Sequence, residues 1–217
     1  MKNNFIELLD NKINGVNSGE FDFTLLSKYK GLIDDDLYFE FVIESNNCGF
    51  FYNQSLHIYS YSGINNFGDI DLINSILKQE YGEIILNLIS FGQDLFGNQF
   101  CFSIGDKKII FFNAETGEKQ VIASDFSNWL AVIKKDLAFY TGVDLLTTWR
   151  SNNSFAFDQR LCPKMPFVIG GDYAVDNLYA GTFPAFLQAY ANIARQVYNL
   201  PEGTKVQLVI GEKPRSR

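Results

Sequence analysis

Two stretches decide the fold: ISFGQDLFGNQFCFSI, residues 89–104, and IIFFNAETGEKQVIASDFSNWL, residues 109–130. In the first, Phe100, Phe102 and Ile104 alternate with polar or small residues. This alternation is typical of a strand that buries one of its faces.

Turns separate the strand-like segments of this region. The Gly-Asp pair at residues 105–106 predicts a two-residue hairpin, and residues 113–117 predict a second turn into the segment EKQVIA. An apolar run at residues 86–91 supplies a further strand before them. Together the segments predict an antiparallel meander, which needs a cover over at least one face.

A helix at residues 126–137 would supply that cover, with Ser124 or Asp125 as its cap. Apolar residues recur at helical spacing along it: Phe126, Trp129, Leu130, Ile133 and Leu137. We therefore expect Trp129 to lie in the core.

Three elements are expected before the meander. Residues 5–13 predict a short helix, and the aromatic segment 50–61 predicts two short strands. Residues 73–81 predict a helix that Asp69 or Asp71 could cap.

Residues 34–44, DDDLYFEFVIE, fit two interpretations. Alternate residues are apolar, as in a strand, but apolar residues also follow the spacing of a helix. The three aspartates at the start favour a helix, because carboxylates cap open N–H groups and interact well with the helix dipole.

The predicted class is α+β, a twisted antiparallel sheet covered by helices, with a small α/β C-terminal extension. We expect a domain at residues 1–146, a polar connection at 147–160 and an extension at 161–217 that packs on the domain.

Within the extension, strands are expected at residues 167–169, 173–179 and 205–210. A helix is expected to begin at Thr182, its cap, with Pro184 in the first turn, where proline is tolerated.

Charge and composition exclude several function classes. The 217 residues include 18 Lys and Arg against 25 Asp and Glu, a formal charge of −7, without a block of consecutive basic residues. Nucleic acid is therefore an unexpected partner, and a basic protein is a natural one. No apolar run is long enough to span a membrane, and no export signal stands out, so we expect a cytoplasmic protein without membrane contact.

Metal and cofactor chemistry has little support. His57 is the one histidine, and Cys48, Cys101 and Cys162 are widely spaced, with no C-x-x-C pair. No phosphate-binding or nucleophile motif occurs, so we expect no cofactor, no metal site and no catalytic residues. Residues 94–98 resemble half of a calcium loop, but a turn with a glycine explains them better.

Acidic clusters are the candidate contact residues. They fit two interpretations: solvated caps and turns, or a shared docking surface for a partner. The residues are Asp34, Asp35, Asp36, Asp69, Asp71, Glu115 and Glu118.

Two quoted segments resemble the SMI1/KNR4 family of the SUKH superfamily. The first is LIDDDLYFEFVIESNNCGFFYNQSLHIYSYS at residues 32–62, similar to the family's helix, Asn/Gly-rich turn and strand pair. The second, more specific, is the stretch at 89–130, similar to the family's strands and closing helix with its F-x-x-W-L pattern. In the first segment, GLIDDD replaces the family's Leu-Pro before the acidic turn.

The resemblance implies a helix at residues 34–45 and a non-enzymatic α+β binding module. Bacterial members are similar to immunity proteins that neutralise polymorphic toxins, often nucleases, and fungal members regulate cell-wall glucan synthesis. The closing stretch is similar to a C-terminal extension of longer bacterial members. An acidic chain also suits a basic toxin as its partner.

Two rival interpretations stay open. The first is an enzyme or sugar-binding protein that uses the aromatic strands at residues 50–61 and the Asp69/Asp71 pair; a deep pocket lined by these residues would favour it. The second is an intracellular regulatory scaffold.

Overall fold

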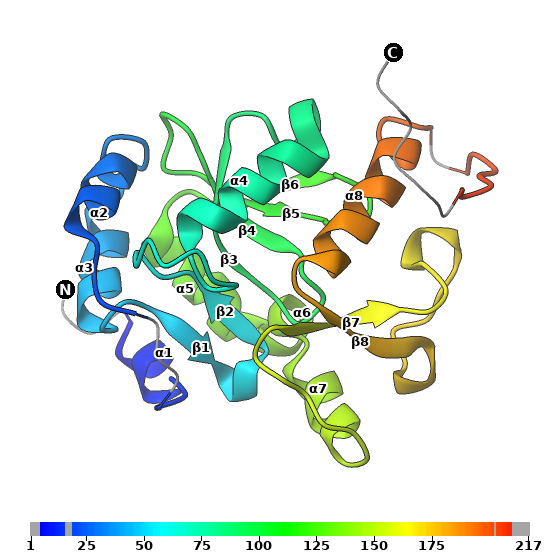
Figure 1. Cartoon of the computed structure of the whole chain (residues 1–217), viewed down its shortest axis with the longest axis horizontal. Coiled ribbons are helices and arrows are strands. Elements are labelled where there is room, and N and C mark those ends of the chain that lie inside the picture. Colours follow the sequence, from blue (N-terminus) through cyan, green and yellow to red (C-terminus); the bar gives the residue numbers. More distant parts are fainter. Residues whose placement is uncertain (1–4, 16–18, 202, 210–217) are drawn as a thin grey trace.

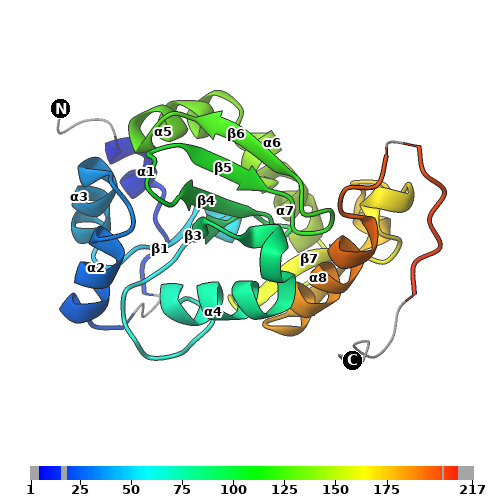
Figure 2. The ribbon, with the colours of Figure 1, turned by 90° about the horizontal axis from the view of Figure 1, so that it is seen from above.

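An antiparallel six-stranded sheet forms the centre of the molecule, which is described from a computed structural model covering residues 5–15, 19–201 and 203–209. The strands cross the sheet in chain order (Figures 1 and 2): β1 (Gly49–Phe51), β2 (Leu56–Ile58), β3 (Leu88–Gln93), β4 (Gln99–Ser103), β5 (Ile109–Phe112) and β6 (Lys119–Ala123). This order confirms the predicted meander.

One turn of the meander differs from its prediction. β4 ends at Ser103 and β5 begins at Ile109, so residues 104–108 join them and the two-residue hairpin at 105–106 is wrong. The backbone N–H of Ser103 donates to Lys108 O, and Asp106 accepts from Lys108 N, which closes a wider loop. The turn at residues 113–117 forms as predicted, with Gly117 at φ +75°.

Helices cover both faces of the sheet. Strand alternation puts Phe100 and Phe111 on one face and Phe112 on the other. Trp129 of α5 (Phe126–Lys135) lies 5.3 Å from the Phe100 ring, and Tyr81 of α4 (Ile70–Tyr81) lies 5.2 Å from the Phe112 ring. The two helices therefore bury opposite faces (Figure 2).

The α5 helix confirms most of its sequence prediction. Asp125 is its N-cap, with its side chain accepting from Asn128 N, and Trp129 is fully buried. The helix ends at Lys135, however, so Leu137 lies in a separate helix, α6 (Leu137–Thr141).

Among the described residues, three helices precede the sheet: α1 (Ile6–Asp10), α2 (Phe23–Lys30) and α3 (Asp36–Glu44). The α3 helix settles the ambiguity at residues 34–44 in favour of a helix. The α4 helix also confirms its prediction, with Asp69 as its cap and Gly82 at its end.

The C-terminal part departs from the sequence prediction in its details. Its elements are α7 (Val143–Arg150), β7 (Gln159–Pro163), β8 (Leu178–Thr182) and α8 (Ala185–Val197). The first residues of the polar stretch at 147–160 are therefore helical. The threonine hydroxyls of this stretch form hydrogen bonds within α7, because Thr147 and Thr148 donate to the carbonyls four residues earlier.

The strands expected in this part are misplaced. Phe167–Ile169 is a 3₁₀ turn. In the strand expected at 173–179, Val175–Asn177 is also a 3₁₀ turn, and only residues 178–179 belong to β8, which pairs with β7. Residues 205–209 form no strand, and residue 210 lies outside the described residues. Thr182 is the last residue of β8, so Pro184 and not Thr182 is the cap position of α8, without a side-chain hydrogen bond.

The α8 helix packs on the sheet region beside α4 (Figures 1 and 2). Its residues Phe186, Leu187 and Tyr190 belong to the same buried apolar cluster as the sheet. A side chain at Gly97, before β4, would meet Phe186, because a Cβ there would lie 2.9 Å from the ring. The extension and the sheet therefore share one core.

Candidate functional site

Asp35 and Asp69 are buried and serve the fold. Asp35 accepts from Tyr38 N at 3.1 Å and from Phe126 N at 2.8 Å, and Asp69 accepts from the backbone N–H groups at the start of α4. Asp69 is also 0% exposed. The expectation that both lie on a docking surface is therefore corrected: both carboxylates are buried, and their oxygens accept hydrogen bonds within the fold, including one from Ser62 Oγ to Asp69.

Glu115 is buried as well. Its Oε2 accepts from Val168 N at 3.2 Å, which fastens the segment before β8 to the β5–β6 turn. Burial raises the pKa of this carboxyl to about 7, although the backbone hydrogen bond works in the opposite direction. It is likewise not available as an exposed contact.

The other four candidates are more accessible, but they do not converge. Asp34 lies 3.9 Å from Lys107 in the β4–β5 loop, and Asp71 pairs with Lys28. Glu118 follows the β5–β6 turn, at the opposite end of β5 from Lys107. Asp36 begins α3 and is exposed.

Glu118 borders a cleft of about 760 Å³ that we call the acidic cleft. It lies between the strand ends at the β5–β6 turn, helices α6 and α7, and the segment that precedes β8. It is lined by Asp94, Phe96, Asn98, Phe111, Asn113, Glu118, Lys119, Gln120, Ala138, Phe139, Gly142, Asp144, Leu145 and Tyr173.

Aromatic side chains form the walls of the acidic cleft. Phe139 of α6 is 63% exposed and Tyr173 is 59% exposed, which is unusual for rings of this size. Tyr173 is nevertheless held in place, since its ring stacks on Phe167 at 3.9 Å and meets Phe96 edge-on at 5.3 Å. The cleft therefore presents ordered apolar surface to solvent.

Negative charge dominates the polar groups of the acidic cleft. Its lining includes the carboxylates Asp94, Glu118 and Asp144 against the single ammonium of Lys119. Glu118 and Asp144 are exposed, whereas Asp94 is buried. The rim can therefore attract a cationic group, while the aromatic walls attract an apolar one.

Asp94 organises the floor of the acidic cleft. It accepts from Phe96 N at 2.8 Å and from both the backbone and side-chain N–H groups of Asn98. These bonds define the turn at residues 94–98 predicted from its glycine, Gly97, which has φ +82°. Burial raises the pKa of Asp94 to about 7, with the Asn98 and Phe96 hydrogen bonds opposing the shift.

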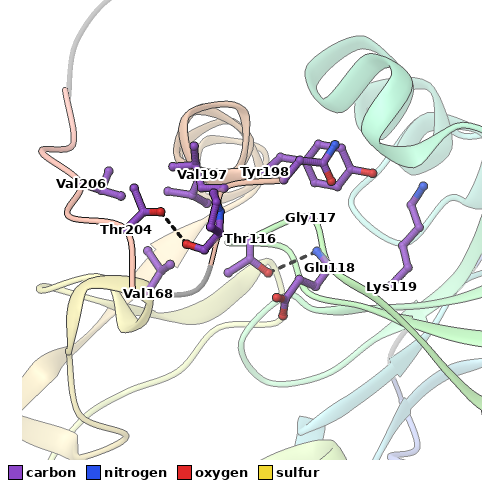
Figure 3. A pocket seen from close by; sticks show the side chains of 13 residues that line it. Thr116, Gly117, Glu118, Lys119, Val168, Val197, Tyr198, Thr204 and Val206 are labelled. Atoms are coloured by element: carbon purple, nitrogen blue, oxygen red, sulfur yellow. Dashed lines mark hydrogen bonds between the residues drawn. The ribbon is translucent and has the colours of Figure 1, made fainter.

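A second hollow of about 590 Å³ lies on the other side of the β5–β6 turn. Figure 3 shows it between the turn residues Thr116–Lys119, the end of α8 at Val197 and Tyr198, and the later residues Thr204 and Val206. Glu118 and Lys119 line both hollows, so the β5–β6 turn is the wall that separates them.

His57 lies in the core and has a structural role. It is 2% exposed and its ring stacks on Phe50 with centroids 4.0 Å apart. Burial, and then the nearby charge of Arg160, hold its pKa well below the usual range. Among the described residues, no three His, Cys, Asp or Glu side chains are grouped as a metal site would require.

Most of the aromatic side chains proposed for a sugar-like ligand are closed inside the core, and Tyr52 borders a hollow of only about 30 Å³. Tyr59, Tyr61 and Asp69 are 0% exposed, and the two hydroxyls bond to Gln99 and Tyr38 inside the core. These residues pack the protein interior.

Sequence reasoning missed most of the acidic cleft. Phe139, Asp144 and Tyr173 come from three different elements, and only the folded chain brings them to the β5–β6 turn. One signal was present: Phe139 and Asp144 flank Gly142, whose φ of +72° joins α6 to α7.

Comparisons with known proteins agree with this architecture. Residues 27–132 match the model of the SMI1 / KNR4 family (SUKH-1). The crystal structure of Atu4351 from Agrobacterium tumefaciens superposes with a TM-score of 0.59 at 15% sequence identity, over 88% of each chain, which shows a shared fold. No curated protein matches the sequence. Within residues 5–15, 19–201 and 203–209, no helix has the length and apolar character that a membrane crossing requires.

Proposed function

Because residues 27–132 belong to the SMI1/KNR4 family (SUKH-1), we propose that this protein is a non-enzymatic binding protein of the immunity type. Its partner is a basic toxin, which it neutralises in the cytoplasm by covering part of the toxin surface. The acidic cleft is the contact site.

The single observation that carries the proposal is the composition of the acidic cleft. Protein interfaces are centred on buried aromatic side chains and surrounded by a polar rim. The acidic cleft has both parts, with Phe111, Phe139 and Tyr173 as walls and Glu118 and Asp144 as exposed carboxylates. A lysine or arginine beside an apolar side chain on the toxin would complement it.

The exposed carboxylates outside the cleft have a different role in this proposal. Asp34, Asp36 and Asp71 lie away from Glu118 and contribute to the net charge of −7. Charges outside the contact site accelerate the encounter with a basic protein and add little to the affinity of the final complex.

The sugar-binding or enzymatic alternative has less support. Tyr59, Tyr61 and Asp69 are packed inside the core. Asp71 pairs with Lys28, and the lone histidine is buried against Phe50. The regulatory-scaffold alternative also predicts protein binding. It differs from the immunity proposal because a scaffold would not protect the cell from a toxin.

Growth protection tests the proposal. The protein encoded by the neighbouring reading frame is expressed in a host with and without this chain. We expect arrested growth to be restored by the chain and the two proteins to elute together in gel filtration. A complex without growth protection would favour the scaffold, and no complex would contradict both.

A further inference from the structure

Strand β6 lies at an open edge of the sheet, directly beside the acidic cleft. It pairs with β5, and in the part of the chain that the structure describes no other strand pairs with it. The opposite edge is protected, since Ile13 N donates to Phe50 O at 2.8 Å and Tyr52 N donates to Asn11 O at 3.0 Å, which covers β1. The β1 edge of the sheet is therefore covered, whereas the β6 edge is open.

The open edge presents backbone hydrogen-bonding groups to solvent. Asn113 N donates to Glu118 O at 2.9 Å, so Glu118 points its carbonyl toward β5, while its N–H donates to the Thr116 hydroxyl within the turn. In antiparallel pairs the direction alternates, so the backbone groups of Lys119 and Val121 point away from β5. Both residues are exposed, and the Val121 residue is 59% exposed.

We propose that the toxin docks by adding an extended segment to β6, so that its alternate side chains enter the acidic cleft. The inference rests on the proposed function for the identity of the occupant. An added strand satisfies the open backbone groups, and pockets on one face then select its side chains.

The strand faces place those side chains over the cleft. Gln120 is the cross-strand partner of Phe111, so both lie on the face that lines the cleft. Residues of the added segment on this face would lie near Phe111 and Phe139, and a basic residue among them would reach Glu118 or Asp144. The segment is therefore expected to alternate and to carry apolar and basic residues on one face.

Charge argues against a second copy of this chain as the occupant. Two copies would bring two acidic clefts together, each with the exposed carboxylates of Glu118 and Asp144 against one ammonium, on chains of net charge −7. The edge strand also carries Lys119, a residue type that discourages edge-to-edge pairing of identical sheets.

A displayed library of random twelve-residue peptides, selected on the full chain, tests the inference without the toxin. We expect enriched peptides to alternate apolar and basic residues. They should bind Val121→Pro at least tenfold more weakly than the wild type, because proline removes an outward N–H that an edge strand can lose without unfolding. Val121→Thr keeps the N–H and is the matched control, expected to bind as the wild type does.

Peptide chemistry gives a second test that does not depend on how a variant folds. N-methylation of the alternate peptide amides that face β6 should reduce binding at least tenfold, and methylation of the other set should not. Strand addition would be overturned if the two methylated sets bound equally, or if no peptide were enriched. It would also be overturned if Val121→Pro and Val121→Thr, both folded, bound the peptides equally. Failure of growth protection alone would overturn the toxin role and leave the edge site standing.

Discussion

Asp35 Oδ2 accepts a hydrogen bond of 2.8 Å from the backbone N–H of Phe126, 91 residues further along the chain. The other oxygen of the same carboxylate accepts from Tyr38 N in α3. One buried side chain therefore joins the starts of α3 and α5, two helices that meet at the edge of the aromatic core.

Asp35→Ala should lower the free energy of unfolding by about 2–4 kcal/mol. The change removes a helix cap, worth ~1 kcal/mol, and leaves the buried N–H of Phe126 without a partner, at a cost of about 1–3 kcal/mol. Asp34→Ala is the neighbouring control, and its exposed side chain should change stability by less than about 0.5 kcal/mol. Urea unfolding measures both, and equal effects would show that Asp35 has no special role.

Trp129→Ala should cost about 3–5 kcal/mol, as truncation of large buried aromatics does. The indole is fully buried and stacks on Phe126, with Phe91 and Phe100 edge-on to it. In a Trp149→Phe background, the remaining fluorescence should resist an aqueous quencher. Quenching as efficient as that of free indole would contradict this packing.

Removal of the residues after Arg150 should destabilise the sheet region. The cut exposes the surface that Phe186, Leu187 and Tyr190 of α8 cover in the shared core. The fragment of residues 1–150 is therefore expected to melt below the full chain. A cooperative transition at the full-length temperature would instead show that the predicted domain at 1–146 is independent.

Glu115→Gln should change how stability depends on pH. The pKa of Glu115 is about 7 in the folded state against 4.5 for an ordinary glutamate. Between these pH values the folded protein holds a proton that the unfolded chain releases. This group therefore makes the free energy of unfolding fall as pH rises, by at most about 1.4 kcal/mol per pH unit. The curve levels off above pH 7.

The glutamine variant keeps an acceptor for Val168 N and has no proton to lose. Denaturant unfolding from pH 4 to 8 should therefore give a flatter curve for the variant, with higher stability than the wild type at pH 8. Asp94 retains the same direction of dependence in both proteins. Parallel curves would contradict burial of a neutral Glu115.

The sequence predicted the meander of β3 to β6 and the main cover helices because local signals carry them. Alternation marked β4, the apolar stripe marked α5, and aspartates marked the starts of α3 and α4. The extension was predicted less well, because its turns depend on distant groups: Phe167–Ile169 forms a 3₁₀ turn whose Val168 is bonded to Glu115, 53 residues earlier in the chain.

The candidate site was harder to predict for a related reason. A carboxylate that caps a buried helix and one that faces solvent look alike in a sequence, so Asp35 and Glu118 were grouped together. The acidic cleft depends on where α6, α7 and Tyr173 come to rest around the β5–β6 turn.

The most direct test of the acidic cleft measures association and dissociation rates at several salt concentrations for two matched double variants. The partner is the protein encoded by the neighbouring reading frame. Glu118→Gln with Asp144→Asn removes charge inside the cleft, and Asp34→Asn with Asp36→Asn removes the same charge outside it. We expect the cleft variant to dissociate at least tenfold faster, and the outer variant only to associate more slowly, with a flatter salt dependence. Equal dissociation rates for the wild type and the cleft variant would contradict binding at the acidic cleft.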